Sequence, residues 1–472
     1  MNALKTFFKI DNKQIDPRLR DYQNEDIQIM LKRKVNGLFY EQRLGKTPTT
    51  IVTIANNPNI HKTLIIAPKS THVNWEQEIY KWHNENIKVA RIRGTLEQRK
   101  NYYSKDYSYF IMTYETASID KEIIPNVNCI VIDEAHRLRN FKGQRSKQSP
   151  TFTKNVLQLS YKIPYKFALS GTPASNKSED IYPILNFLYP DLFSSYWNFI
   201  NFYYFVNQEQ KVTRNGWDSV TVINGLKPNG KVYLQEFLDL TCIQRKRKDH
   251  MKWIPKVDKK LIKIPMSNIQ TKYYNQLNKT WECEALGFDC QNQLVLTTRL
   301  RQIANLNEGC KQEFILNYLD DYPEEKIIVS SAFTSCLKEL KEKIKTKREV
   351  LLISGETTAK SRQEIVDRFN KSTKPVILLG NIGVIKEGIK LETAETLIEL
   401  DPSLTQADNQ QVYDRFIPTT QEAALSKNKQ QIIKLIAKNS IDEYIFECLK
   451  LKKSAAEIVN NFKSEKDVKT IS

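Results

Sequence analysis

LFYEQRLGKTPTT, residues 38–50, is the stretch that decides the fold of this chain. An apolar run leads into a loop that ends in Gly45-Lys46-Thr47, and Pro48 then suits the first turn of a helix. Phosphate binding needs backbone N–H groups at a helix N-terminus, a lysine that reaches the β- and γ-phosphates, and a hydroxyl on Mg²⁺. Lys46 and Thr47 supply the last two. The stretch therefore predicts a phosphate loop for ATP and Mg²⁺. The alternative is that Gly-Lys-Thr occurs here by chance, because Tyr40 replaces the first glycine of the general phosphate-loop pattern G-x-x-x-x-G-K-T.

A second motif, CIVIDEAHRLRN at residues 129–140, carries two adjacent carboxylates behind an apolar strand. Its DEAH sequence begins at Asp133, at the carboxyl end of that strand, and this is the edge of an α/β sheet where ligands bind. There Asp133 can hold Mg²⁺ while Glu134 orients and deprotonates the attacking water, as nucleotide hydrolysis requires. The alternative reading is a pair of acids that stabilise a helix N-terminus. The phosphate loop upstream favours the chemical reading.

The net charge, the cysteine spacing and the length of the apolar runs limit the possible binding partners and the cellular compartment. The 472 residues include 72 Lys and Arg against 54 Asp and Glu, so the net charge is 72 − 54 = +18. Such a charge favours a polyanionic partner, nucleic acid first and an anionic membrane second. The seven cysteines form no C-x-x-C pair, which argues against a zinc ribbon or a disulfide framework. No apolar run approaches the ~20 residues of a membrane span, so a cytoplasmic protein is expected.

Short apolar runs rich in β-branched residues predict two parallel sheets. Helix-length segments such as 358–370 separate the runs. The runs are 63–67, 109–113, 129–132 and 167–169 in the first set, and 326–330, 350–353, 376–379, 396–400 and 431–437 in the second. We therefore expect an α/β chain of two units, 1–255 and 256–472, with a protrusion and a basic linker within 190–255.

The protrusion begins with an aromatic stretch at residues 193–206. The steps of three and four between Phe193, Trp197, Ile200 and Tyr204 predict a buried helical face, with stacking on unpaired bases as the alternative. Three Asn-Gly pairs follow, each predicting a turn: 215–216, 224–225 and 229–230.

Taken in order, the motifs resemble those of the Swi/Snf-like branch of helicase superfamily two, the DNA-translocating ATPases, over nearly the whole chain. In the first half the resemblance rests on LRDYQ (19–23), LIIAPKSTHVNWEQEIYKW (64–82), IMTYETA (111–117) and FALSGTPASNKSEDIYPILNFLYPDLF (167–193). In the second half it rests on RLRQIANL (299–306), ISGETTAKSRQEIVDRFN (353–370) and LIELDPSLTQADNQQVYDR (397–415). It implies two RecA-like lobes of parallel sheets flanked by helices, plus a small helical and hairpin protrusion.

The resemblance also implies roles for individual residues. Gln23 would read adenine, and Arg415 would act as an arginine finger in catalysis beside Lys46 and Glu134. The nucleotide would further contact Gly45, Lys46, Thr47 and Gly388, with Thr47 and Asp133 on Mg²⁺. Lys69, Thr113 and Tyr114 would contact DNA, with the duplex form favoured.

The enzyme so implied is a DNA-dependent ATPase. As a translocase or helicase it would hydrolyse ATP to move along or remodel duplex or branched DNA in replication, recombination or repair.

Several positions depart from the family pattern, among them Tyr40, Arg43 and Pro418. Tyr40 and Arg43 stand where the phosphate loop is expected to carry Asp and its first Gly, and Pro418 stands where the last motif normally has a second Arg. Pro418 motivates a rival function, a nucleotide-gated DNA clamp with slow or absent ATP turnover.

A basic run spans residues 245–263, where nine Lys or Arg stand against two Asp, a net charge of 9 − 2 = +7. Its start resembles the family's Arg-Arg-x-Lys element. Arg245 and Arg247 are therefore predicted either to brace the lobes or to meet DNA phosphates, and a solvated face is the even alternative.

Overall fold

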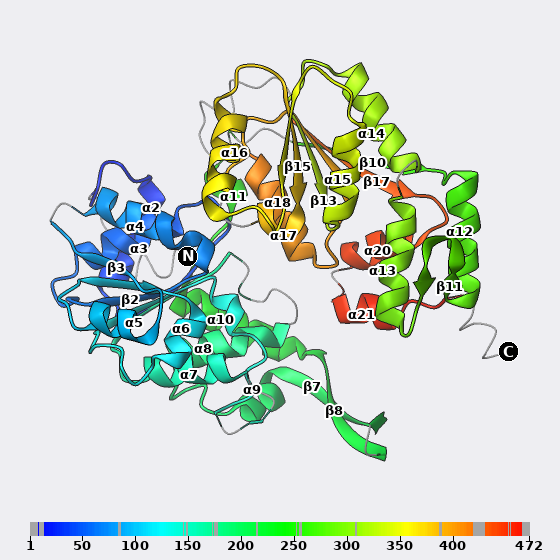
Figure 1. Cartoon of the computed structure of the whole chain (residues 1–472). Coiled ribbons are helices and arrows are strands. Elements are labelled where there is room, and N and C mark those ends of the chain that lie inside the picture. Colours follow the sequence, from blue (N-terminus) through cyan, green and yellow to red (C-terminus); the bar gives the residue numbers. More distant parts are fainter. Residues whose placement is uncertain are drawn as a thin grey trace. The chain divides into compact units, whose positions relative to one another are not determined.

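The computed structural model describes Phe8 and residues 14–464, apart from 84–85, 145, 148–149, 172, 174–177, 214–215, 252, 254–256, 307–308, 387–388, 419–429, 452 and 454. The chain forms two compact units, Met1–His250 and Met251–Ser472 (Figure 1). The boundary expected at residues 255–256 lies outside the described residues. No helix among the described residues has both the length and the apolar character that a membrane crossing needs.

Unit 1 is built on a seven-stranded sheet in the order β3-β4-β2-β5-β6-β1-β9, and all neighbouring strands are parallel. The strands are β1 (Val35–Tyr40), β2 (Thr63–Ile66), β3 (Val89–Arg91), β4 (Tyr109–Met112), β5 (Cys129–Asp133), β6 (Tyr165–Leu169) and β9 (Cys242–Arg245). Strands β2, β4 and β5 are buried along their whole length, which explains their continuous apolar sequences. The carboxyl ends of parallel strands share one edge, so the sheet brings the phosphate loop after β1 and the carboxylates of β5 to that edge.

Helices separate the strands of unit 1. They are α2 (Asp21–Leu31), α3 (Lys46–Ala55), α4 (His72–Trp82), α5 (Leu96–Tyr103), α6 (Tyr114–Ile119), α7 (Thr151–Ser160), α8 (Tyr182–Leu188), α9 (Tyr196–Tyr203), α10 (Pro228–Thr241) and α11 (Arg247–His250). Short 3₁₀ turns lie at η1 (Lys69–Thr71), η2 (Ala135–Leu138) and η3 (Ser178–Ile181).

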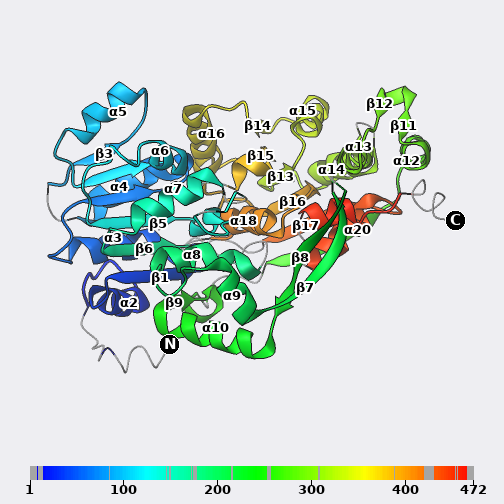
Figure 2. The ribbon, with the colours of Figure 1, turned by 90° about the horizontal axis from the view of Figure 1, so that it is seen from below.

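The protrusion consists of α9, α10 and a long antiparallel hairpin, β7 (Tyr204–Thr213) with β8 (Gly216–Leu226), which extends away from the sheet of unit 1 (Figures 1 and 2). Phe193, Ile200 and Tyr204 are buried as predicted. Trp197 is exposed, because the buried face of α9 consists of Tyr196, Phe199 and Ile200.

Two of the three Asn-Gly turn predictions are wrong. Asn224-Gly225 lies within β8 and Asn229-Gly230 in the first turn of α10. Gly230 is needed there for close packing, since a Cβ on it would lie 2.4 Å from the Tyr203 carbonyl oxygen. The first pair includes Asn215, which lies outside the described residues.

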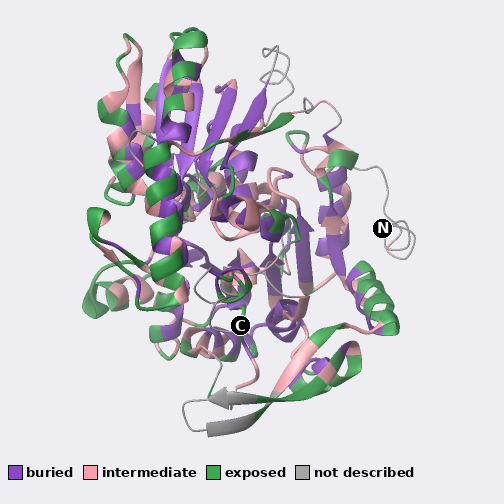
Figure 3. Cartoon of the chain, turned by 90° about the vertical axis from the view of Figure 1, so that its right-hand side faces the viewer, coloured by how far each residue is buried: buried purple, intermediate pink, exposed green. Residues whose placement is uncertain are grey.

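Unit 2 repeats the α/β plan with a six-stranded parallel sheet in the order β10-β17-β16-β13-β15-β14. The strands are β10 (Asp258–Ile264), β13 (Ile327–Ser331), β14 (Glu349–Ile353), β15 (Val376–Asn381), β16 (Thr396–Asp401) and β17 (Gln431–Ala437). Alternate side chains feed two apolar cores: Ile328, Leu378 and Leu397 lie in one, and Ile327, Ile377 and Ile398 in the other. Both sheets are largely buried (Figure 3). Two parallel sheets flanked by helices confirm the predicted fold class.

The helices of unit 2 are α12 (Asn268–Thr280), α13 (Gln293–Ala304), α14 (Cys310–Asp321), α15 (Thr334–Lys343), α16 (Ala359–Lys371), α17 (Ile382–Ile385), α18 (Gln406–Phe416), α20 (Ile441–Lys450) and α21 (Ala455–Asn460). A small hairpin of β11 (Glu282–Cys283) and β12 (Phe288–Asp289) flanks η4 (Glu284–Leu286). Side-chain caps set several of the helix starts. Thr358, for example, accepts the Ser361 N–H at α16.

The basic run at 245–263 is divided between the two units. Arg245 ends β9 at one edge of the first sheet, whereas residues 258–264 form β10 at an edge of the second. Lys259, Lys260 and Lys263 are exposed there, and lysines on an edge strand discourage pairing with another chain.

The prediction that Arg245 meets DNA phosphates or lies on a solvated face is wrong. Its guanidinium is buried and donates to both carboxylate oxygens of Asp26 on α2, at 2.6 and 2.9 Å. The Tyr40 hydroxyl of β1 donates to the same carboxylate at 2.5 Å. Asp26 therefore joins α2, β1 and β9 beneath the phosphate loop.

Substituting Asp26 with Asn should lower the free energy of unfolding by about 3–5 kcal/mol, because it leaves the Arg245 guanidinium buried without its closest counter-charge. Denaturant titration measures the loss. Asp16→Asn is the matched control, since Asp16 pairs with the half-exposed Arg18 and its loss should cost less than about 1 kcal/mol. Equal losses in the two variants would contradict this account of the buried pair.

Candidate active site

The phosphate loop joins β1 to α3, and its backbone explains the residues found there. Gly45, the residue before α3, has φ +80°, and a Cβ on it would lie 2.5 Å from Nε2 of Gln23. Glycine is therefore required at 45. Arg43 has φ +70°, the left-handed backbone that the glycine of the family pattern would adopt without strain. The loop keeps that conformation with Arg in place, at a cost of roughly 1 kcal/mol.

Gln23, which the family resemblance assigns to adenine, lies against this loop. Its Nε2 donates to the Gly45 carbonyl at 3.2 Å and to Oγ1 of Thr49 at 2.9 Å, while its Oε1 accepts the Arg20 N–H at 3.0 Å. The neighbouring Tyr22 hydroxyl donates to the Leu44 carbonyl at 2.8 Å. Helix α2 therefore holds the second half of the loop.

Lys46 and Thr47 open α3 at the carboxyl end of β1. The Lys46 ammonium donates to the Tyr40 carbonyl at 3.1 Å. A Cβ on Gly171 would lie 3.7 Å from the Lys46 Nζ. The ammonium thus lies between the phosphate loop and the Ser170-Gly171 segment after β6.

Asp133 and Glu134 end β5 at the same edge of the sheet. Asp133 is buried and accepts the Trp75 indole N–H at 2.9 Å and the Glu134 N–H at 3.0 Å. Burial, followed by the negative charge of Glu134, raises the pKa of Asp133 to about 6, against the opposing effects of the Trp75 hydrogen bond and the positive charge of Lys46. A carboxylate held in this way suits a cation such as Mg²⁺, for which Thr47 is the second predicted ligand.

Tyr114 does not face DNA as predicted. Its side chain is buried, with an exposed fraction of 2%, and its hydroxyl donates to the carbonyls of Asp133 and Glu134 at 2.6 and 3.2 Å. Glu134 has φ +53°, so these bonds brace a strained backbone at the two acids. The hydroxyl had no predicted role, although a buried tyrosine usually finds a hydrogen-bond partner for it.

His136 and Ser170 are further residues that the sequence did not assign. The His136 ring lies 3.4 Å from the Glu134 carboxylate and 3.3 Å from the Ser170 hydroxyl. Burial lowers the pKa of His136, which favours the neutral ring. The ring thereby joins the DEAH motif to the Ser-Gly-Thr-Pro segment, of which Thr172 lies outside the described residues.

The other residues predicted to contact DNA are Thr113, Lys69 and Arg247, and each has a different local environment. Thr113 caps α6 by accepting the Thr116 N–H at 3.1 Å, and Lys69 is exposed in η1 after β2. The Arg247 N–H donates to the Glu41 carboxylate of the phosphate loop at 2.7 Å.

Unit 2 holds Arg415 near the end of α18. Its Nε donates to the Lys386 carbonyl at 3.0 Å, and its own carbonyl accepts the Leu391 N–H at 2.9 Å. Pro418 is buried just beyond it. Gly388, the other predicted nucleotide residue of this unit, lies outside the described residues.

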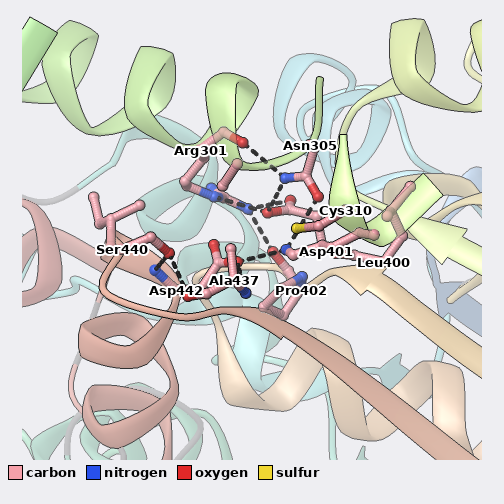
Figure 4. A network of polar contacts seen from close by, with 12 residues as sticks. Arg301, Asn305, Cys310, Leu400, Asp401, Pro402, Ala437, Ser440 and Asp442 are labelled. Atoms are coloured by element: carbon pink, nitrogen blue, oxygen red, sulfur yellow. Dashed lines mark hydrogen bonds and ion pairs between the residues drawn. The ribbon is translucent and has the colours of Figure 1, made fainter. Parts of the chain in front are cut away.

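A buried polar network supports the strand that leads into α18 (Figure 4). Arg301 of α13 donates to the Asp401 carboxylate and to the Pro402 carbonyl, each at 2.5 Å. Lys311 of α14 joins the Leu400 carbonyl, at 3.0 Å, to the Asp442 carboxylate, at 2.5 Å. The network fixes the end of β16 against α13, α14 and α20.

Comparisons with known proteins identify the family of the chain. Residues 22–315, well over half of the chain, match the model of the SNF2-related domain. The chain belongs to the SNF2-related family. Residues 310–417 match the helicase conserved C-terminal domain. The predicted resemblance to Swi/Snf-like, helicase-type ATPases is thereby confirmed.

Among curated relatives, the SNF2-family chain is 26% identical to an uncharacterized ATP-dependent helicase of Mycoplasma genitalium, covering 96% of this chain and 44% of the relative. It is 24% identical to the ISWI chromatin-remodeling complex ATPase ISW1 of Saccharomyces cerevisiae, covering 92% of this chain and 40% of that protein. It thus spans less than half of the length of these relatives.

A solved structure, the Sulfolobus solfataricus SWI2/SNF2 ATPase core in complex with dsDNA, matches with a TM-score of 0.43 and 20% identity, covering 98% of this chain and 96% of that one.

Replacing Tyr114 with Phe should lower the ATP turnover of this SNF2-family protein while leaving its affinity for ATP near that of the wild type. The change removes the Tyr114 donor from the carbonyls of Asp133 and Glu134, of which the second keeps the Arg137 N–H, and a lost hydrogen bond costs about 0.5–1.5 kcal/mol. Steady-state kinetics per folded molecule and an unfolding titration measure both effects.

Tyr109→Phe is the matched control, because the Tyr109 hydroxyl is bonded to His83 at 2.6 Å and Tyr109 begins β4, at the opposite end of the sheet from the acids that end β5. This control should leave turnover unchanged. Turnover per folded molecule that is the same in Tyr114→Phe and the wild type would show that the hydroxyl does not serve the site.

Proposed function

We propose that the protein is an ATP-dependent DNA translocase or helicase, which hydrolyses ATP to move along or remodel DNA in replication, recombination or repair. The observation that carries the proposal is the convergence of Lys46, Asp133 and Glu134 at one sheet edge. There the charge of Lys46 acts on the Asp133 carboxyl. Family membership supports ATP as the substrate, and the net charge of +18 supports DNA as the binding partner.

Each residue has a separate part in the proposed hydrolysis. Lys46 reaches the β- and γ-phosphates, and Thr47 and Asp133 hold Mg²⁺, which neutralises charge on the phosphates. Glu134 accepts a proton from the attacking water. Trp75 and Tyr114 fix the two acids through the bonds described above, so that little reorganisation accompanies the reaction.

Measuring phosphate release with and without duplex DNA tests the proposal. The wild type should hydrolyse ATP faster when DNA is added. Lys46→Ala should abolish turnover, and Glu134→Gln should bind ATP but not hydrolyse it, because an amide cannot take a proton from water. Turnover unchanged in a folded Lys46→Ala variant would overturn the assignment of the phosphate loop. ATP-dependent changes in DNA affinity without any turnover would instead identify a nucleotide-gated clamp.

Arg415 is proposed as the arginine finger. Such a cation contributes about 10³–10⁵ in rate in well-studied nucleotide hydrolases, and Pro418 leaves no second arginine in the motif. Arg415→Ala should therefore lose nearly all DNA-stimulated turnover.

Arg368→Ala is the control for this variant, because Arg368 is exposed and its guanidinium pairs with Glu349 on the surface of unit 2. It should leave turnover unchanged. Hydrolysis that survives Arg415→Ala would show that another residue supplies the charge, with Arg43 of the phosphate loop the first to test.

A further inference from the structure

The last residues of unit 1, here named the exit segment (residues 245–250), contact the phosphate loop directly. Strand β9 lies beside β1, and the ladder between them continues past Tyr40, where the Glu41 N–H donates to the Arg245 carbonyl at 3.0 Å. The Glu41 carboxylate then accepts the Arg247 N–H at 2.7 Å and lies 3.7 Å from Nε of the same residue. The start of the loop is therefore bonded to the exit segment by both the backbone and the side chain of Glu41.

The exit segment also contacts the residue that holds the end of the loop. The His250 ring lies on the Tyr22 ring, with centroids 4.3 Å apart, and its Nε2 is 3.3 Å from the Arg245 guanidinium. The Tyr22 hydroxyl is the donor to the Leu44 carbonyl. Both ends of the loop 41–45 are thus linked to the segment through which the chain leaves unit 1.

Glu41 directly follows Tyr40, whose carbonyl accepts a hydrogen bond from the Lys46 ammonium. The Tyr40–Glu41 peptide is therefore shared between Lys46 on one side and the exit segment on the other. An ammonium has three donors, so Lys46 can keep this bond while it contacts a phosphate. A shift of the exit segment would move the peptide and, with it, the position of the ammonium.

We propose that Glu41 is a positioning residue through which the exit segment sets the affinity of the phosphate loop for the phosphates of a nucleoside triphosphate. The inference rests on the proposed function, since it assumes that Lys46 serves a nucleotide. Because coupling between two sites is reciprocal, a bound triphosphate must in turn bias the exit segment, at the point where the chain passes to unit 2. Sequence alone gave Glu41 no role.

The affinity for a non-hydrolysable ATP analogue with Mg²⁺, measured on the full chain, tests the role of Glu41. Glu41→Ala removes the acceptor of the Arg247 N–H and should weaken binding roughly threefold to tenfold, the range that a lost hydrogen bond gives. Glu41→Gln keeps an oxygen acceptor and should bind within about twofold of the wild type. The Gln variant separates positioning from a merely structural role, because rescue by a neutral acceptor requires the hydrogen bond itself.

A charge-matched pair gives an independent test. Arg247→Glu places a second carboxylate beside Glu41, whereas Lys248→Glu makes the same change of charge at an exposed neighbour. Only the first should weaken binding of the analogue. Glu41→Ala that binds like the wild type, or equal losses at 247 and 248, would overturn the proposal while leaving ATP binding intact. A wild type that does not bind the analogue would instead overturn the proposed function, and this proposal with it.

Discussion

A single buried carboxylate, Asp26, holds together the three elements on which the candidate site depends. It takes two bonds from Arg245 on β9 and one from Tyr40 on β1, while itself lying on α2. A buried charge of this kind is costly unless it is paired and hydrogen-bonded, and here its partners come from segments more than two hundred residues apart. The arrangement therefore specifies how α2, β1 and β9 pack together, and the phosphate loop begins directly after Tyr40, at the point where these elements meet.

The same carboxylate explains one departure from the family pattern. Tyr40 stands where Asp is expected, and it is fully buried with its hydroxyl on Asp26. The position retains a polar side chain that anchors the loop, although the group is now a donor rather than an acceptor. Arg43 shows the opposite case, because it retains a glycine-like backbone with a side chain added.

The sequence predicted most strands of the two sheets, because buried parallel strands are continuous apolar runs; β17, for example, spans the predicted residues 431–437. It missed β3, β9 and β10. The predictions failed where the outcome depends on tertiary contacts. The sequence does not show that Asp26 lies beside Arg245, so Arg245 was predicted to contact DNA or solvent. Nor does it show that the Tyr114 hydroxyl donates to the Asp133 carbonyl. Helical periodicity failed at Trp197 because Phe193 and Tyr204, the two ends of the predicted pattern, lie outside α9.

The central claim is that the phosphate loop and the exit segment behave as one body. Amide hydrogen exchange on the full chain, with and without ATP and Mg²⁺, tests it most directly, since exchange reports local opening. The account predicts that exchange slows together in peptides covering residues 38–47 and 242–250 when the nucleotide binds. Slowing confined to 38–47, with 242–250 unchanged, would contradict it.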